Sequence, residues 1–309
     1  MKKQRVKRGA GHHWWPQSLS NYWLTEGAIR RIDPDGAVVP STPINLGLIT
    51  GGHDIVFETE SPWEESFEHV FGGADNRFPD VVQELQSLAK AHRAARESQG
   101  DITCYAQACQ EQLLRSLLEC LISLVVRSPK FRAGAVQAAT RFWGAELSKK
   151  EQKLIAAANV RATYWRLTRD LSVRGKYVLF CAESEEFIFG DGFYNNLWAS
   201  TDNLFGARML VPITPELCVL YVRPSQCNPV PRLVTRSAQA DLVALINETV
   251  QIYAKDYLFF RSQQPRLSEH FKARDHREYY GFDPVQELIE QIPGVPPRPA
   301  PEDALLSGR

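Results

Sequence analysis

The segment LLRSLLECLISLVVR, residues 113–127, decides which kind of fold this chain of 309 residues can adopt. Its leucine, isoleucine and valine residues cover so wide an arc of a helical wheel that we expect a helix buried on most sides. The helix is predicted to start near Cys104 and to end at Arg127, because Pro129 cannot continue it. Glu119 interrupts the apolar run, which is shorter than the roughly 20 residues that cross a bilayer. The segment therefore indicates the central helix of a globular protein.

Further helices are expected on both sides of this segment. Ser61 with Glu64 and Ser148 with Glu151 have the spacing of capping boxes, in which the first side chain caps the helix and the second reaches back to it. The expected helices cover residues 61–72, 78–96, 132–142, 149–171 and 239–262.

Strand signals cluster in two blocks that flank the helices. Residues 19–40 hold β-branched runs around the turn Asp33-Pro34-Asp35-Gly36, and residues 176–222 hold several apolar runs separated by turn residues. Strands grouped in blocks argue against alternating βαβ winding. We predict an α+β fold, a mostly helical single domain with a small, mainly antiparallel sheet built from residues 19–40 and 176–222. The alternative is a helical domain with two detached hairpins.

The two ends of the chain lack the pattern of a core. Five of the first eight residues are Lys or Arg, and the last 18 residues contain five prolines without a period. We expect a flexible basic arm at residues 1–10, a single α+β domain at 11–291, and a proline-rich disordered tail at 292–309.

Composition and charge exclude several classes of protein. Hydrophobic residues make up 44% and charged residues 23%, which is ordinary for a folded chain. The 36 basic and 36 acidic residues cancel, so a small or single-stranded ligand fits better than duplex DNA. Six scattered cysteines and no export signal indicate reduced thiols and a cytoplasmic location, with no membrane association. A zinc site from Cys104, Cys109 and a remote histidine stays open, because the spacing is not diagnostic.

Common nucleotide-binding and hydrolase motifs are absent from the sequence. Instead, His12 and His13 precede two tryptophans, Trp14 and Trp15. Burial against indole rings lowers the pKa of an imidazole and would leave a neutral base at neutral pH. The alternative is that backbone carbonyls satisfy these histidines within an aromatic core.

Three further polar features stand beside apolar segments. Arg127 and Arg132 are placed to hold a phosphate or carboxylate, although Arg127 could equally neutralise the end of its helix. Asp191, between two glycines after an apolar strand, is either a catalytic carboxylate or part of a turn. Asn247 lies on the apolar face of a helix, where its amide must bind either a loop backbone or a ligand.

The order of these features resembles the bacterial domain-of-unknown-function family numbered 4238, over about residues 10–262. The sequence departs from the family pattern at Gly190-Asp191-Gly192-Phe193, which stands where the family has Ser-Asp-x-Pro. The carboxylate is kept but the geometry imposed by the proline is lost. The family brings no established activity. The matching elements are His13-Trp14-Trp15-Pro16, Trp63-Glu64-Glu65-Ser66-Phe67, Arg127-Ser128-Pro129-Lys130-Phe131-Arg132, Pro212-Ile213-Thr214-Pro215 and Asn247.

We expect His13, Arg127, Asp191 and Asn247 to converge on one polar cleft with His12 beside it, because unpaired polar groups next to apolar elements are costly and tend to satisfy one another. The structural alternative to a functional cleft is a buried polar network that fixes the N-terminal hairpin to the helices.

The expected function is metal-independent cleavage of phosphodiesters in RNA or another nucleotide, without a cofactor, by an effector of the bacterial defence type. His13 would be the general base or acid, Asp191 would orient its ring, and the two arginines would hold the phosphate. Tyr194 and Trp198 would stack on bases.

Two alternatives to this function remain. His13 and Asp191 could ligate a divalent metal, although a third ligand is not identifiable. The protein could also be a non-catalytic binding module that recognises a phosphorylated or acidic ligand and has a protein partner.

Overall fold

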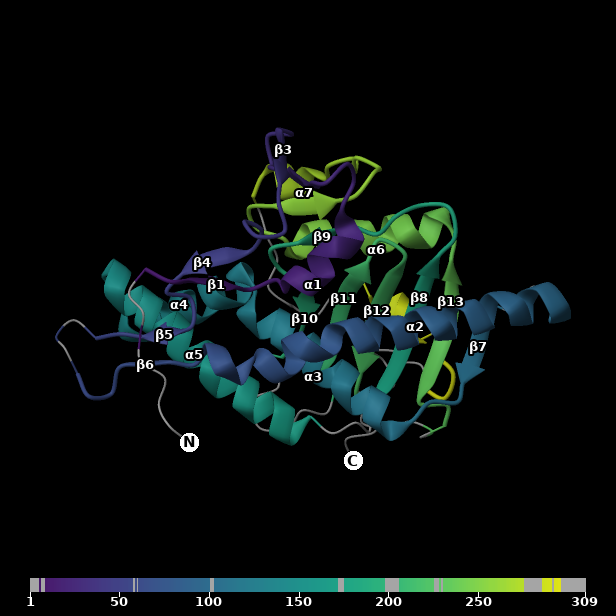
Figure 1. Cartoon of the computed structure of the whole chain (residues 1–309), viewed down its shortest axis with the longest axis horizontal. Coiled ribbons are helices and arrows are strands. Elements are labelled where there is room, and N and C mark those ends of the chain that lie inside the picture. The colour runs from purple at the N-terminus through teal and green to yellow at the C-terminus, as the bar shows by residue number, and fades with distance from the viewer. Residues whose placement is uncertain are drawn as a thin grey trace, which may run out of the picture.

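The α+β class is confirmed by a computed structural model of the chain (Figure 1). The structure describes residues 9–57, 61–100, 103–171, 175–197, 206–224, 230–274, 285–290 and 292–295, together with residues 6, 59 and 228.

A six-stranded sheet forms the centre of the fold. Its strand order is β10-β11-β12-β8-β13-β7, and every neighbouring pair is antiparallel except β13 with β8, which is parallel. Helices cover both faces, so the side chains of both faces are buried and the strands have continuous apolar runs. The strands are β7 (Cys104–Gln107), β8 (Lys176–Ala182), β10 (Tyr194–Asn195), β11 (Arg208–Thr214), β12 (Leu217–Val222) and β13 (Leu233–Ala238).

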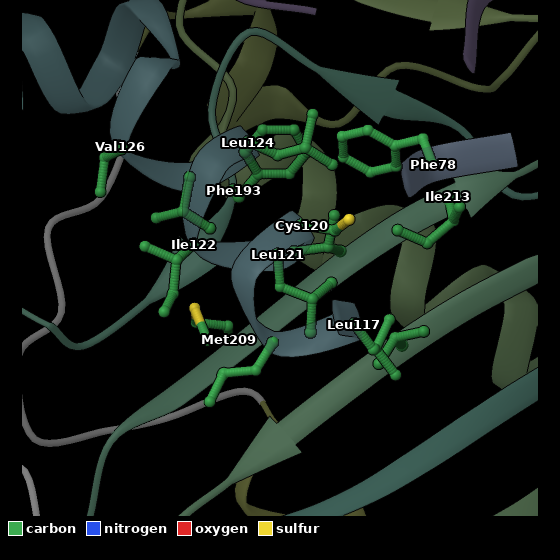
Figure 2. Close-up of a cluster of buried hydrophobic side chains, with 14 of the residues drawn as sticks. Phe78, Leu117, Cys120, Leu121, Ile122, Leu124, Val126, Phe193, Met209 and Ile213 are labelled. Carbon is green, nitrogen blue, oxygen red and sulfur yellow. The ribbon is translucent and has the colours of Figure 1, made fainter. Parts of the chain in front are cut away.

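One face of this sheet packs on α2 (Gly72–Gln99) and α3 (Glu111–Arg127). Figure 2 shows Leu117 and Leu121 of α3 among buried side chains that include Met209 of β11. As predicted, α3 is the central helix, and nearly all of its positions after the first turn are buried.

The start of the central helix was predicted too early. Residues 104–107 form the edge strand β7, which pairs with β13 and places Tyr105 opposite Thr235. The helix begins only at Glu111. A strand of four residues has no strong period of its own, so its pairing with a distant strand decides its conformation.

The strands of the first block belong to a separate four-stranded sheet, which corrects the prediction of one sheet from residues 19–40 and 176–222. Its order is β3-β2-β14-β9, and only β9 comes from the second block. The predicted helix over residues 239–262 ends at Tyr253, because residues 258–260 pair with β2. The members are β2 (Ile29–Ile32), β3 (Val38–Ser41), β9 (Phe189–Gly190) and β14 (Leu258–Phe260).

Two small two-stranded sheets lie next to helices α4 (Pro129–Trp143) and α5 (Lys149–Asp170), on the left of Figure 1. The capping box of Ser148 and Glu151 at the start of α5 is confirmed. The box predicted at Ser61 is wrong, because the chain there turns and then pairs as strand β6. The pairs are β1 (Gly11–His13) with β4 (Leu48–Thr50), and β5 (Asp54–Ile55) with β6 (Glu65–Ser66).

The second face of the six-stranded sheet is covered by α6 (Ala240–Tyr253) and α8 (Gln286–Glu290). Ile292, where the tail was predicted to begin, is buried in the same cluster, and the Nζ of Lys176 donates a hydrogen bond to the Pro293 carbonyl at 2.9 Å. The ordered chain therefore extends past the predicted boundary. Residues 296–309 and most of residues 1–10 lie outside the described residues.

Short helical segments complete the described chain. None of the described helices is both long and apolar enough to cross a membrane. The short segments are α1 (Gln17–Ser20), the 3-10 turns η1 (Asn21–Trp23) and η2 (Glu68–Val70), and α7 (Glu269–Lys272).

Candidate functional site

The His13 side chain binds local groups of its own region. Its Nδ1 lies 3.0 Å from the Leu46 carbonyl, and its Nε2 lies 3.0 Å from the amide nitrogen of Gln17. Only the backbone carbonyl of His13 reaches Arg127, at 3.3 Å. The ring therefore has partners other than the carboxylate of Asp191 that was expected to orient it.

Arg127 makes a buried structural ion pair. Its guanidinium is fully buried, binds both carboxylate oxygens of Asp75 at 3.0 and 2.7 Å, and donates from Nε to the Ser123 carbonyl. It also lies 4.7 Å from the centre of the Phe71 ring. The guanidinium that was predicted to bind phosphate thus makes a bidentate pair within the chain.

Asp191 connects two segments of the backbone. Its carboxylate is fully buried and accepts hydrogen bonds from the backbone N–H groups of Lys255 and Asp256, at 2.6 and 2.9 Å. Its carbonyl accepts from the Lys130 N–H at 3.1 Å. Burial raises the pKa of Asp191 to about 6, although these backbone hydrogen bonds oppose the shift. These contacts are those of a structural carboxylate, the turn alternative considered from the sequence.

Asn247 also has a structural role. Its side chain accepts from the Ile188 N–H at 3.0 Å and donates to the Glu186 carbonyl at 2.9 Å, so the amide binds a loop backbone. Tyr194 is 1% exposed and packs edge-on against Tyr253, which leaves no open ring face for a base. Trp198 lies outside the described residues.

A different set of polar side chains meets where the two two-stranded sheets lie together. His12 comes from β1, His53 follows the glycine turn after β4, and Glu68 comes from η2 after β6. The His53 N–H donates to Nδ1 of His12 at 3.0 Å, and the two imidazole rings stack with centres 5.2 Å apart. Nδ1 of His53 is hydrogen-bonded to Oε2 of Glu68. We call His12, His53 and Glu68 the histidine cluster.

The turn between β4 and β5 positions His53. Gly51 adopts a left-handed φ of +65°, which a glycine tolerates without steric cost, and the Gly52 N–H closes the turn on the Ile49 carbonyl. His53 is then held on its other side, because its carbonyl accepts from the Phe67 N–H at 2.9 Å.

The environment sets the charges in this cluster. Burial lowers the pKa of His53 to about 4; its bond to Glu68 opposes this, and the charges of Arg127 and Arg132 reinforce it. Burial alone would raise the pKa of Glu68, but its contact with His53 lowers that pKa below its ordinary value. At neutral pH the site therefore holds a neutral imidazole beside an ionised carboxylate.

Arg132 is a buried cation next to the cluster. It is 8% exposed, and Nη1 donates to the Gly52 carbonyl at 2.8 Å. Within the described part of the chain no carboxylate pairs with it. Burial lowers the pKa of Arg132 to about 10, so it stays charged at neutral pH. A guanidinium has five N–H donors, and one that is buried without an anion suits an anionic ligand.

The histidine cluster has the spacing of metal ligands, since each residue offers one nitrogen or oxygen atom within 4.8 Å of the others. The hydrogen bonds specify the proton positions, however. Nδ1 of His12 accepts from a backbone N–H, so its Nε2 carries the proton and has no lone pair for a metal. Oδ1 of buried Asp54 faces that Nε2 at 3.8 Å. As arranged, the groups are those of acid–base chemistry, and metal binding through His12 would require the backbone hydrogen bond to break.

The sequence reasoning missed His53 and Glu68. Gly51 and Gly52 form a turn, and a histidine after a turn has no periodic context in the sequence. The sequence offers one signal for this pair. A histidine, His53, and a carboxylate, Glu68, stand on either side of an expected helix start that does not form.

Comparison with protein-family models finds no match, and neither do the searches of curated proteins and solved structures. The resemblance to the family numbered 4238 stays a prediction. The candidate site is therefore defined by geometry alone. It contains a neutral histidine oriented by a carboxylate, a second histidine that accepts a backbone hydrogen bond, and a buried arginine with no carboxylate partner among the described residues.

Proposed function

We propose that this protein is a metal-independent phosphodiesterase that acts on RNA or another nucleotide, with His53 as its general base. The observation that carries the proposal is the buried Arg132, which has no carboxylate partner among the described residues and lies near a neutral histidine oriented by Glu68. A cytoplasmic location and an effector role of the bacterial defence type belong to the same proposal.

The proposed reaction moves one proton and exchanges one phosphorus–oxygen bond for another. Nε2 of His53 takes the proton of the attacking hydroxyl, either water or a ribose 2′-hydroxyl, while a bond forms to phosphorus. The bond to the leaving oxygen breaks, and His53 returns the proton to that oxygen. Glu68 stabilises the transient imidazolium, Arg132 binds a non-bridging oxygen, and the Nε2–H of His12 donates a further hydrogen bond.

The test measures cleavage of a fluorogenic oligoribonucleotide in the presence of a metal chelator. His53→Gln should lower kcat about 100-fold or more, since a positioned base contributes roughly that factor. His13→Gln is the matched control and should keep kcat within about threefold. Among the described residues, the hydrogen-bond partners of the His13 ring are Leu46 and Gln17, which lie outside the histidine cluster. A folded His53→Gln protein with wild-type kcat would overturn the proposal.

The same unpaired arginine supports a second function, a binding module for a phosphorylated or acidic ligand, with a protein as its partner. Calorimetric titration with pyrophosphate distinguishes the two functions. Binding that is lost in Arg132→Gln, without cleavage of any oligonucleotide by the wild type, would favour the binding module.

A further inference from the structure

Two large aromatic side chains are exposed side by side where α4 ends. Phe142 is 86% exposed and Trp143 is 57% exposed. Gly144, in the left-handed region with φ +65°, caps the helix directly after them. Aromatic side chains normally bury most of their surface, so an adjacent exposed pair is a candidate contact surface.

Three lysines follow this pair closely in the sequence, at the start of α5. Lys149, Lys150 and Lys153 are all exposed, and no carboxylate of the described chain forms an ion pair with them. The capping box of Ser148 fixes where α5 begins and therefore where these lysines stand relative to the end of α4. We call Phe142, Trp143 and the three lysines the helical tip.

We infer that the helical tip binds single-stranded RNA. Aromatic rings offer flat faces on which unpaired bases stack, and lysines pair with the phosphates between them. This combination tolerates any base sequence, and it does not require a net positive charge on the whole chain, whose formal charge is zero. The inference rests on the proposed function, to which it adds the form of the substrate.

The position of the tip relative to the candidate site supports one continuous ligand. Arg132 and Phe142 lie on the same helix ten residues apart, which is about 15 Å at 1.5 Å per residue. Helix α4 lies beside β1, β4 and β5 (Figure 1), and its Arg132 binds the carbonyl of Gly52, the residue before His53. A short single strand that stacks on the tip can therefore extend along α4 and present a phosphate to Arg132.

An anionic membrane fits the tip less well. Glu146 and Glu151 are exposed among the lysines, and a bilayer that covered the whole tip would meet both carboxylates. A single strand does not have to cover the whole tip. The apolar part is also small, because it consists of Phe142 and Trp143.

The experiment measures binding of a labelled oligouridine of 12 nucleotides by fluorescence anisotropy. It uses the His53→Gln background so that turnover does not interfere. Replacing both Phe142 and Trp143 by Ala should weaken binding about tenfold or more. Replacing Lys149, Lys150 and Lys153 by Gln should weaken binding and make it less dependent on salt, because fewer counterions are released.

The matched control is Trp63→Ala, which removes a tryptophan that is 68% exposed next to Glu64 and Glu65. This variant should bind like its parent. Equal affinity of the parent and both tip variants would overturn the inference. So would tip-dependent binding to vesicles of phosphatidylcholine and phosphatidylserine without binding to the oligonucleotide. Tip-dependent RNA binding by a wild type that cleaves nothing would support the inference while the proposed phosphodiesterase failed.

Discussion

The side chains of His12 and His13 have different environments because the two residues are neighbours on a strand. Successive side chains of β1 point to opposite sides, so His12 is turned inward and His13 outward. His12 then accepts the backbone N–H of His53, whereas His13 binds Leu46 and Gln17 at the periphery. A pair of identical residues gives no indication of which one faces the interior. The roles of His12 and His13 could therefore be assigned only when the orientation of the strand was known.

The pH dependence of the proposed reaction follows from the lowered pKa of His53. A base with a pKa of about 4 is unprotonated through the neutral range and becomes protonated only below that value. We expect kcat/KM to stay flat from pH 8 down to about pH 5 and to fall at lower pH. Steady-state rates across this range test the prediction. An acid limb centred near pH 6.5 would contradict it and would point to an exposed histidine.

Because the carboxylate of Asp191 is buried, we expect its effect on stability to change with pH in the opposite direction to that of an ordinary salt-bridged aspartate. Its pKa is raised from 3.8 to about 6 in the folded state, so the folded protein binds the proton more tightly than the unfolded chain. The stability from this proton is complete at low pH and is lost as the pH rises toward 6. The carboxylate of Asp256, which also raises this pKa, acts in the same direction.

Asp191→Asn provides the measurement, because asparagine does not titrate. The unfolding free energy of the wild type minus that of the variant should decrease by about 2 kcal/mol between pH 4.5 and pH 7, because the pKa of Asp191 is raised from 3.8 to about 6 on folding. Chemical denaturation at both pH values gives this difference. An increase would mean that the backbone donors of Lys255 and Asp256 outweigh burial.

Helices α2 and α3 are joined by an ion pair as well as by apolar packing. Asp75 lies in the first turn of α2, and Arg127 in the last turn of α3. Each charge also suits its helix end, since the N-terminus of α2 favours an anion and the C-terminus of α3 a cation. The same guanidinium donates to the His13 carbonyl and thereby holds β1 against the helices. Part of the polar network predicted from the sequence therefore exists, with Asp75 in place of Asp191.

Removing one charge of this pair should be costly. Asp75→Asn leaves the fully buried guanidinium of Arg127 without its anion, which is expected to lower the unfolding free energy by about 3 kcal/mol. Urea denaturation measures the loss. Arg115→Met, which removes the exposed pair with Glu111, is the control and should change stability by less than about 0.5 kcal/mol. If both substitutions changed the unfolding free energy by a similarly small amount, the buried pair would not stabilise the packing of α2 on α3.

The whole molecule is layered, with the six-stranded sheet between α2 and α3 on one face and α6 with α8 on the other. Figure 1 shows α2 crossing this sheet. Residues near the end of the described chain complete the second layer, because Ile292 packs in the cluster that includes Val178 and Phe180. The C-terminal segment thus contributes to the core from a region whose composition suggested a tail.

This contribution can be measured with Ile292→Ala, which should lower the unfolding free energy by about 2 to 4 kcal/mol, as for other large-to-small changes in a core. Ile44→Ala is the control, since Ile44 is 67% exposed. Thermal and urea unfolding of both variants test the prediction. Equal stability of the wild type and Ile292→Ala would place the true end of the core before residue 292.

By itself, the sequence determined the elements with strong local signals. The 3.6-residue pattern of residues 113–127 predicted the central helix, the Ser148 capping box placed the start of α5, and apolar runs marked β8, β11 and β12. It also predicted that Arg132 binds an anion, and this role stays a prediction that the proposed function uses. These signals come from residues close together in the sequence, so they could be predicted without knowledge of long-range contacts.

Only the tertiary structure decided the partners of the polar side chains. His53 reaches Glu68 across 15 residues, Arg127 reaches Asp75 across 52, and Arg132 reaches Gly52 across 80. Short strands such as β7 and β14 were missed for the same reason, since pairing with distant strands fixes them. A hydrogen bond depends on angstrom-scale distances between groups far apart in sequence, and no local pattern of residues encodes such a distance.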